Sequence, residues 1–173
     1  MFRHPQFINI LCKVYKPQIY LELGIYNGET ITGLQAHCKR RIGVDVNPLW
    51  NENKSNFPGI EVYETTTDDF FINFKEKVDF VFIDADHNFE SVKKDFLNSV
   101  KILNPGGVIV LHDTDPIRDN LLEVGLCSDS FKMVKYLESQ VDFNCVTIPV
   151  YDEGLTIVTR KNENRVSLRK GAK

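Results

Sequence analysis

The densest group of chemically active side chains lies in two short segments, Asp84-Ala-Asp86-His87 and His112-Asp113-Thr114-Asp115. Each segment directly follows an apolar, β-branched run that predicts a buried strand. If these strands are neighbours in a parallel sheet, about 4.8 Å apart, their carboxyl ends bring the two segments together. Four acids and two of the chain's four histidines would then share one site.

Two chemistries could use these side chains, and the sequence leaves both open. Asp84 and Asp113, with His87 or His112, could hold a divalent cation such as Mg²⁺ or Mn²⁺, which favour oxygen ligands. The cation would lower the pKa of a substrate hydroxyl and orient that hydroxyl. Alternatively, His87 or His112 acts as a general base without a metal, since the unperturbed pKa of histidine is about 6.5.

Some polar residues of these segments have a purely structural alternative. Asp86 or Asn88 could cap the helix that follows the first segment. Asp115 precedes a proline and could simply start a turn. The two other histidines, His4 and His37, are expected to be ordinary surface residues outside the site.

A second candidate site begins at the glycine-rich turn Glu22-Leu-Gly24-Ile-Tyr26-Asn-Gly28. A turn of this kind between a first strand and a first helix is where open α/β sheets bind nucleosides. Gly24 would let the backbone pass close to a ligand, and Gly28 would open the helix N-terminus. Tyr26 stands where a dinucleotide motif has its central glycine, and Glu22 would repel a pyrophosphate but suit an amine.

Three further polar residues follow the next two predicted strands. Asp45 comes about twenty residues after Glu22, where a carboxylate can accept hydrogen bonds from both ribose hydroxyls. Thr67 and Asp68 lie where an adenine edge could be held. Asp45 alone could be a turn residue, and Asp68 could cap a helix. Because these positions and the glycine turn follow successive strands, together they favour a nucleoside site.

The elements that must position these residues alternate along the chain. Strands are predicted at 19–23, 41–46, 60–64, 78–83 and 108–111, and helices within 1–16 and at 30–38, 69–74, 89–103 and 131–140. The turn 104–107 separates the helix 89–103 from the next strand. Two further strands, 143–150 and 155–159, form a plausible hairpin. Near-continuous β-branched strands between helices indicate an α/β fold whose parallel sheet is covered on both faces.

Composition indicates one globular domain, expected over residues 1–160, with a polar tail at 161–173. The chain has 173 residues, 42% of them hydrophobic, and a net charge of -3. That charge does not suggest a nucleic-acid partner, and no run approaches the ~20 apolar residues of a membrane span. Four cysteines without metal-ligand spacing are expected to be reduced thiols of a cytoplasmic protein.

Taken together, these motifs resemble class I S-adenosylmethionine-dependent methyltransferases, and among them small bacterial O-methyltransferases of the sugar and natural-product type. The resemblance rests on Tyr20–Gly28, Gly43–Asp45, Thr67–Phe71, Phe80–His87 and Pro105–Asp113. It implies a Rossmann-like, doubly wound, three-layered fold with strand order 3-2-1-4-5-7-6 and an antiparallel seventh strand.

The resemblance also implies roles for individual residues. Glu22, Gly24 and Gly28 match the first S-adenosylmethionine motif, Asp45 matches the ribose-binding acid, and Asp84 matches the residue near the methionine end. In metal-dependent relatives, acids matching Asp84 and Asp113 bind the cation.

The chain departs from these relatives in two places. Metal-dependent relatives have asparagine where this chain has Thr114, which leaves a third metal ligand open. Only one short helix precedes the first strand, so the substrate could be large, or a second subunit of a homodimer could complete the pocket. The loop 113–130 is a candidate for substrate contact.

The expected reaction is methylation of a hydroxyl on a small molecule, sugar or glycan. Two alternatives stay open at this point. One is a nicotinamide-dependent oxidoreductase, which Tyr26 and Glu22 disfavour, and the other is a nucleoside-binding module without catalysis.

Overall fold

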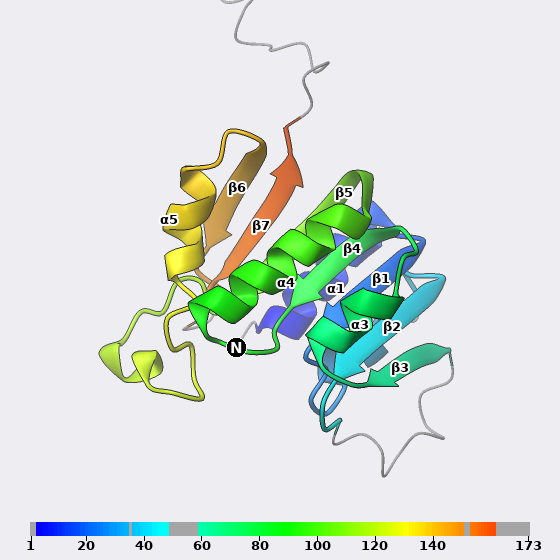
Figure 1. Cartoon of the computed structure of the whole chain (residues 1–173), viewed down its shortest axis with the longest axis horizontal. Coiled ribbons are helices and arrows are strands. Elements are labelled where there is room, and N and C mark those ends of the chain that lie inside the picture. Colours follow the sequence, from blue (N-terminus) through cyan, green and yellow to red (C-terminus); the bar gives the residue numbers. More distant parts are fainter. Residues whose placement is uncertain (1–2, 35, 49–58, 151–152, 162–173) are drawn as a thin grey trace, which may run out of the picture.

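The computed structural model describes residues 3–34, 36–48, 59–150 and 153–161, and it contains one seven-stranded sheet. The strands are β1 (Ile19–Leu23), β2 (Arg40–Asp45), β3 (Ile60–Glu64), β4 (Val78–Ile83), β5 (Leu103–His112), β6 (Phe143–Ile148) and β7 (Leu155–Arg160). Their order is β3-β2-β1-β4-β5-β7-β6, and β7 runs antiparallel to both of its neighbours (Figure 1). This order confirms the predicted fold. Apart from Lys161, the predicted tail lies outside the described residues.

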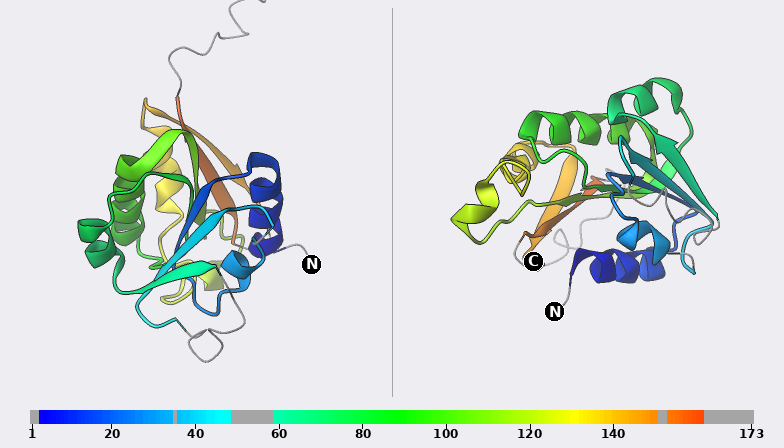
Figure 2. Two further views of the ribbon diagram at one scale, coloured as in Figure 1. Left: turned by 90° about the vertical axis from the view of Figure 1, so that its right-hand side faces the viewer. Right: turned by 90° about the horizontal axis from the view of Figure 1, so that it is seen from below.

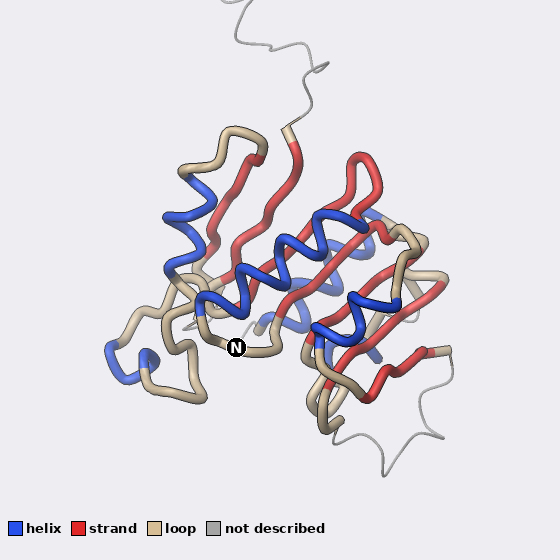
Figure 3. Tube along the Cα trace, viewed as in Figure 1, coloured by secondary structure: helices blue, strands red, loops and turns tan. Residues whose placement is uncertain are grey.

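Helices cover both faces of the sheet and make three layers (Figures 2 and 3). One face carries α1 (His4–Tyr15) and α2 (Glu29–Thr32), and the other carries α3 (Thr67–Asn73), α4 (Phe89–Ile102) and α5 (Lys132–Glu138). A short 3₁₀ helix, η2 (Asp119–Leu122), lies in the loop after β5. Helix α1 therefore lies on the side of the sheet opposite α3 and α4.

Each face of the sheet has its own hydrophobic core. Because side chains alternate along a strand, neighbouring residues of β1 enter different cores. Leu21 packs in the cluster that contains Phe96 of α4, whereas Tyr20 packs in the cluster that contains Ile8 of α1. All four side chains are fully buried. Two cores explain why the central strands are apolar on both faces, and they hold the carboxyl edge of the sheet in place.

The helix after β1 is much shorter than predicted. The sequence predicts a helix over 30–38, but α2 ends at Thr32 and turns follow it. Thr30 and Thr32 are β-branched, and Gly33 has low helix propensity, so the intrinsic support for a longer helix is weak. The Thr32 hydroxyl also donates to the Gly28 carbonyl over 2.7 Å, a side-chain bond that competes with regular helix.

Strand β5 begins earlier than predicted, because the segment expected as a turn is a bulge within the strand. Val78 pairs with Leu103 and Phe80 pairs with Val108, so the extra residues of β5 loop out between the two pairs. Gly106 supplies a left-handed backbone with φ +80°. The Asn104 amide donates to Asp79 Oδ1 over 2.8 Å and fixes the bulge to β4. The glycines thus lie in the bulge, and the strand continues beyond them.

Candidate active site

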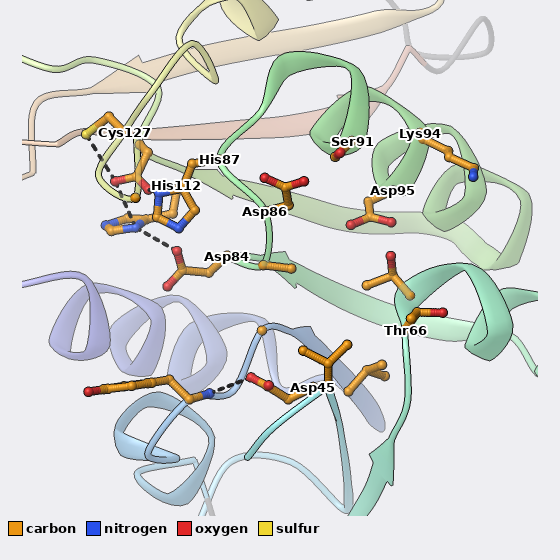
Figure 4. A pocket seen from close by; sticks show the side chains of 18 of the residues that line it. Asp45, Thr66, Asp84, Asp86, His87, Ser91, Lys94, Asp95, His112 and Cys127 are labelled. Atoms are coloured by element: carbon orange, nitrogen blue, oxygen red, sulfur yellow. Dashed lines mark hydrogen bonds and ion pairs between the residues drawn. The ribbon is translucent and has the colours of Figure 1, made fainter. Parts of the chain in front are cut away.

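The carboxyl ends of the central parallel strands form a pocket of ≈ 820 Å³ (Figure 4). Residues that follow β1, β2, β4 and β5 line it, together with the starts of α1 and α3, helix α4 and the loop after β5. Ligands of doubly wound sheets bind at this edge, because loops from neighbouring strands diverge there. Both groups of residues singled out in the sequence have members on the wall of this single pocket.

Gly24 is the point where the first turn touches the end of β4. Its backbone has φ +83°, and a Cβ atom there would lie 2.1 Å from the Asp84 carbonyl oxygen. Only glycine fits this position, because the left-handed backbone and the close approach both exclude a side chain. Gly28 also has a positive φ, as the N-cap of α2, but it does not line the pocket.

The carboxylate of Asp45 is fixed by backbone N–H groups of the turn after β1. Its Oδ2 accepts from the amides of Ile25 and Tyr26, each over 2.9 Å, and its Oδ1 accepts from Asn47 over 2.8 Å. A carboxylate offers about four lone-pair sites. Asp45 lines the pocket with three of these sites in use, and hydrogen bonds from the ribose hydroxyls to this carboxylate stay a prediction.

Glu22 lies beneath the wall of the pocket, not on it. Its side chain is buried, and the Tyr20 hydroxyl donates to Oε2 over 2.6 Å. Burial raises the pKa of Glu22 well above its usual range, which favours the neutral acid. A direct contact between Glu22 and the amine of a ligand stays a prediction.

The start of α3 forms the far end of the pocket, where the adenine edge was predicted. Thr67 and Asp68 line the wall, but α3 begins two residues earlier than expected and its cap is Thr66, whose hydroxyl accepts from the Asp69 amide over 3.1 Å. Asp68 therefore does not cap this helix. It pairs instead with Lys94 of α4 over 2.6 Å.

Helix α4 contributes polar residues to this end that the sequence motifs did not predict. Ser91, Lys94 and Asp95 line the pocket (Figure 4), and Asp95 is 3% exposed. Burial raises the pKa of Asp95 to about 6. A signal was present in the sequence, because Asp95 interrupts the apolar face of α4 next to Phe96. Asn88, by contrast, caps α4 as one prediction proposed, its Oδ1 accepting from the Glu90 amide over 3.0 Å.

The predicted catalytic residues do converge at the other end of the pocket (Figure 4). His112 Nδ1 lies 2.9 Å from Asp84 Oδ1 and 3.2 Å from Asp113 Oδ1. His87 Nδ1 lies 2.7 Å from Asp113 Oδ2. The structure thus brings together all four side chains, two from the end of β4 and two from the end of β5.

Asp113 is held by the loop that follows it. Its backbone is left-handed, with φ +59°, a conformation that only a few non-glycine residues adopt. The Ser130 hydroxyl donates to the Asp113 carbonyl over 2.6 Å, and the Cys127 thiol donates to Oδ1 over 3.4 Å. Gly125 and Leu126 of this loop line the pocket, and contact between the loop and the substrate stays a prediction.

His4 is not the surface residue that the sequence suggested. It is half-buried at the start of α1, its Nε2 lies 3.9 Å from Asp84 Oδ2, and its ring centroid lies 4.2 Å from that of His112. Glu153, just before β7, approaches His112 from another side, with its Oε2 3.4 Å from Nε2. These contacts depend on how α1 and the β6–β7 connection pack on the sheet, so spacing in the sequence could not predict them. His37 is half-buried and is not among the residues that line the pocket.

The three histidines have different electrostatic surroundings. Burial lowers the pKa of His112, but Asp84, Asp113 and Glu153 outweigh burial and hold that pKa well above its usual value. Asp113 raises the pKa of His87. Burial, followed by the charge of His112, lowers the pKa of His4. Without a bound cation, His112 therefore favours its charged form, which cannot accept a further proton.

Comparison with known families decides the class of this protein. Residues 21–114, more than half of the chain, match a family model described as a methyltransferase domain. The chain belongs to this family. The class predicted from the motifs, a class I S-adenosylmethionine-dependent methyltransferase, is confirmed, and the nicotinamide-dependent alternative is set aside. A search of curated protein sequences finds no match to this methyltransferase.

Solved structures share the fold of this methyltransferase at low sequence identity. An O-methyltransferase from Bacillus cereus in complex with S-adenosylhomocysteine has a TM-score of 0.72 at 18% identity, over 90% of this chain and 80% of that one. The O-methyltransferase TomG from Streptomyces achromogenes, in complex with S-adenosylmethionine, gives 0.71 at 18% identity, over 91% and 79%. The methyltransferase PaMTH1 from Podospora anserina gives 0.68 at 16% identity, over 91% and 78%.

Proposed function

We propose that this methyltransferase transfers the methyl group of S-adenosylmethionine to a hydroxyl oxygen of a polar acceptor, a small molecule, sugar or glycan. The observation that supports this most is the division of one pocket into two ends. The donor end carries Gly24, Asp45 and the start of α3. The catalytic end carries the carboxylates and imidazoles around Asp113. Structural neighbours with S-adenosylmethionine or S-adenosylhomocysteine bound agree with this assignment.

In this proposal the adenosine half of S-adenosylmethionine lies along the donor end. Asp45 would accept from a ribose hydroxyl, and Thr67 and Asp68 would lie at the adenine edge. The methionine half would lie past Gly24, beside Asp84. That placement directs the methyl group toward His87, His112 and Asp113. Holding donor and acceptor in line would supply much of the rate acceleration.

The catalytic end also fits a divalent cation. Asp84, His87 and Asp113 each offer a ligand atom, and these atoms lie within 4.8 Å of one another. Two carboxylates and one imidazole suit Mg²⁺ or Mn²⁺, with Mn²⁺ the more tolerant of nitrogen. The Thr114 hydroxyl accepts instead from Thr156 over 2.7 Å, so His87 replaces it as the third ligand in this proposal. A bound cation would lower the pKa of the acceptor hydroxyl.

The lining of the pocket favours a hydroxyl-rich acceptor. Apart from the histidines, Tyr26 is the one aromatic residue among the described residues that line it, whereas acidic side chains occur along its whole length. Flat aromatic acceptors bind between apolar walls, and polyhydroxylated ones bind to carboxylates by hydrogen bonds. Assembly as a homodimer and a cytoplasmic location stay predictions. No helix within the described ranges is long and apolar enough to cross a membrane.

Two alanine variants test the division of the pocket. Asp45→Ala should weaken binding of S-adenosylhomocysteine by about tenfold, because it removes a charged acceptor that is worth about 1.4 kcal/mol or more. Asp113→Ala should leave that affinity unchanged and lower turnover by about 100-fold or more. Calorimetry measures the first effect, and mass spectrometry of methylated sugars and glycans measures the second.

Equal loss of affinity in both variants would contradict the proposed division of the pocket. Binding of S-adenosylmethionine by the wild-type protein, with no methyl transfer to the sugars and glycans tested, would contradict the proposed acceptor class.

A further inference from the structure

Three side chains converge on one wall of the pocket, and the proposed reaction does not use the three together. His4 comes from α1, His112 from the end of β5 and Glu153 from the residues just before β7. Each offers one ligand atom, and these atoms lie within 4.8 Å of one another. His112 is buried, and the other two are half-buried, so the group combines a fixed centre with access from the pocket.

The proton on His112 is placed by its carboxylate neighbours. Nδ1 lies 2.9 Å from Asp84 Oδ1 and 3.2 Å from Asp113 Oδ1, and carboxylates are acceptors only. Nδ1 must therefore donate, which leaves Nε2 as the lone-pair nitrogen of a neutral ring. This is the arrangement found around histidine ligands of metals, where one ring nitrogen donates to a carboxylate and the other binds the cation.

The far side of the same ring faces a second acceptor. Nε2 lies 3.4 Å from Glu153 Oε2. A lone pair and a carboxylate oxygen repel each other unless a proton or a cation lies between them. A direct N–H···O hydrogen bond is typically 2.7–3.2 Å long. Two ligand atoms of a tetrahedral cation, with bonds of about 2.0–2.2 Å, lie roughly 3.3–3.5 Å apart.

His4 completes the group from the other side of the sheet edge. Its ring packs edge-on against His112, with 4.2 Å between the ring centroids. Two imidazoles and one glutamate are a ligand set of catalytic zinc sites, in which a fourth position stays open to water or substrate. Imidazole nitrogen also selects Zn²⁺ or Co²⁺ over Mg²⁺.

From this geometry we infer that His4, His112 and Glu153 form a binding site for a borderline divalent cation of the Zn²⁺ class. The site is distinct from the oxygen-rich group of Asp84, His87 and Asp113. Asp84 would support it by accepting from His112 Nδ1. The inference does not depend on which acceptor is methylated, because it concerns cation binding by the protein alone.

Co²⁺ binding to the whole chain, without S-adenosylmethionine, tests the site. Visible absorption of tetrahedral Co²⁺ should rise to one equivalent in the wild-type protein and should persist in millimolar Mg²⁺. His4→Ala and Glu153→Gln should each weaken Co²⁺ binding by at least about tenfold. The matched control His87→Ala removes a histidine from the neighbouring group in the same pocket, and His37→Ala removes one outside it. With millimolar Mg²⁺ present to fill the neighbouring group, both controls should keep the full tetrahedral Co²⁺ absorption of the wild type.

Three outcomes would overturn the inference. If His87→Ala loses binding and His4→Ala keeps it, the cation lies at the neighbouring group. If no variant differs from the wild type, the cation lies elsewhere. If the wild-type protein binds no Co²⁺ at millimolar concentration, His112 and Glu153 share only a proton. Glu153→Gln keeps the test decisive if His4→Ala fails to fold, which circular dichroism would reveal, and methyl transfer is measured separately.

Discussion

The two ends of the pocket are built in different ways. At the donor end, the key contacts involve the backbone: Gly24 presses against the Asp84 carbonyl, and Asp45 accepts from three main-chain amides. At the catalytic end, side chains hold one another, with His112 among the carboxylates of Asp84, Asp113 and Glu153.

The difference shows which end tolerates change. Backbone contacts are set by strand register and glycine geometry, so a substitution there disturbs the fold as well as ligand binding. Side-chain contacts at the other end can be removed one at a time, and the sheet edge stays intact. Substitutions at the donor end are therefore expected to change stability, and substitutions at the catalytic end are expected to change turnover.

The largest effect on stability is expected at Gly24. Gly24→Ala should lower the free energy of unfolding by about 3 to 5 kcal/mol, because it combines a left-handed backbone with a clash against main-chain atoms. Gly106→Ala is a matched control, since Gly106 has φ +80° and no atom within 4 Å of an added Cβ. Urea denaturation should show a loss of only about 1 to 2 kcal/mol for the control. Equal losses would mean that backbone strain alone, without the clash, explains Gly24.

An intermediate effect, dependent on pH, is expected at Asp95. Its pKa is about 6 in the folded protein, against 3.8 for an ordinary aspartate. The folded state therefore binds this proton more tightly than the unfolded chain, and stability is lost as the pH rises from 4 through 6. Relative to the wild type, the free energy of unfolding of Asp95→Asn should increase by up to about 3 kcal/mol between pH 4 and pH 7.

Thermal and urea unfolding at several pH values measure this gain. Asp142→Asn is the control, because Asp142 is an exposed acid that does not line the pocket. A difference between Asp95→Asn and the wild type that stays constant with pH would show that Asp95 does not titrate in this range.

The smallest effects are expected at two helix caps, one at each end of the pocket. Thr66 caps α3 at the donor end, and Asn88 caps α4 near the catalytic end. Alanine at either position should cost about 1 kcal/mol of stability. Thr66→Ala should also weaken binding of S-adenosylhomocysteine, because the start of α3 lines the donor end, whereas Asn88→Ala should not. Calorimetry that finds the reverse order would contradict the assignment of the two ends.

Local patterns along the chain suffice to predict the sheet, the approximate positions of its strands and the residues at the ends of β1, β2, β4 and β5. These features depend on apolar periodicity and on the rule that parallel strands end at one edge, both of which are local or general. The extent of α2 and the bulge in β5 were not predicted, because Thr32 and Asn104 make side-chain bonds that periodicity does not register.

Packing of distant elements added two residues, His4 and Glu153, to the four that the sequence places at the catalytic end. His4 and Glu153 reach His112 from opposite ends of the chain, because α1 packs across the sheet and β7 inserts between β5 and β6. Tertiary structure also decided that Glu22 is buried while Asp95 lines the pocket. Such contacts arise from packing between elements far apart in sequence, and no spacing of residues along one chain specifies them.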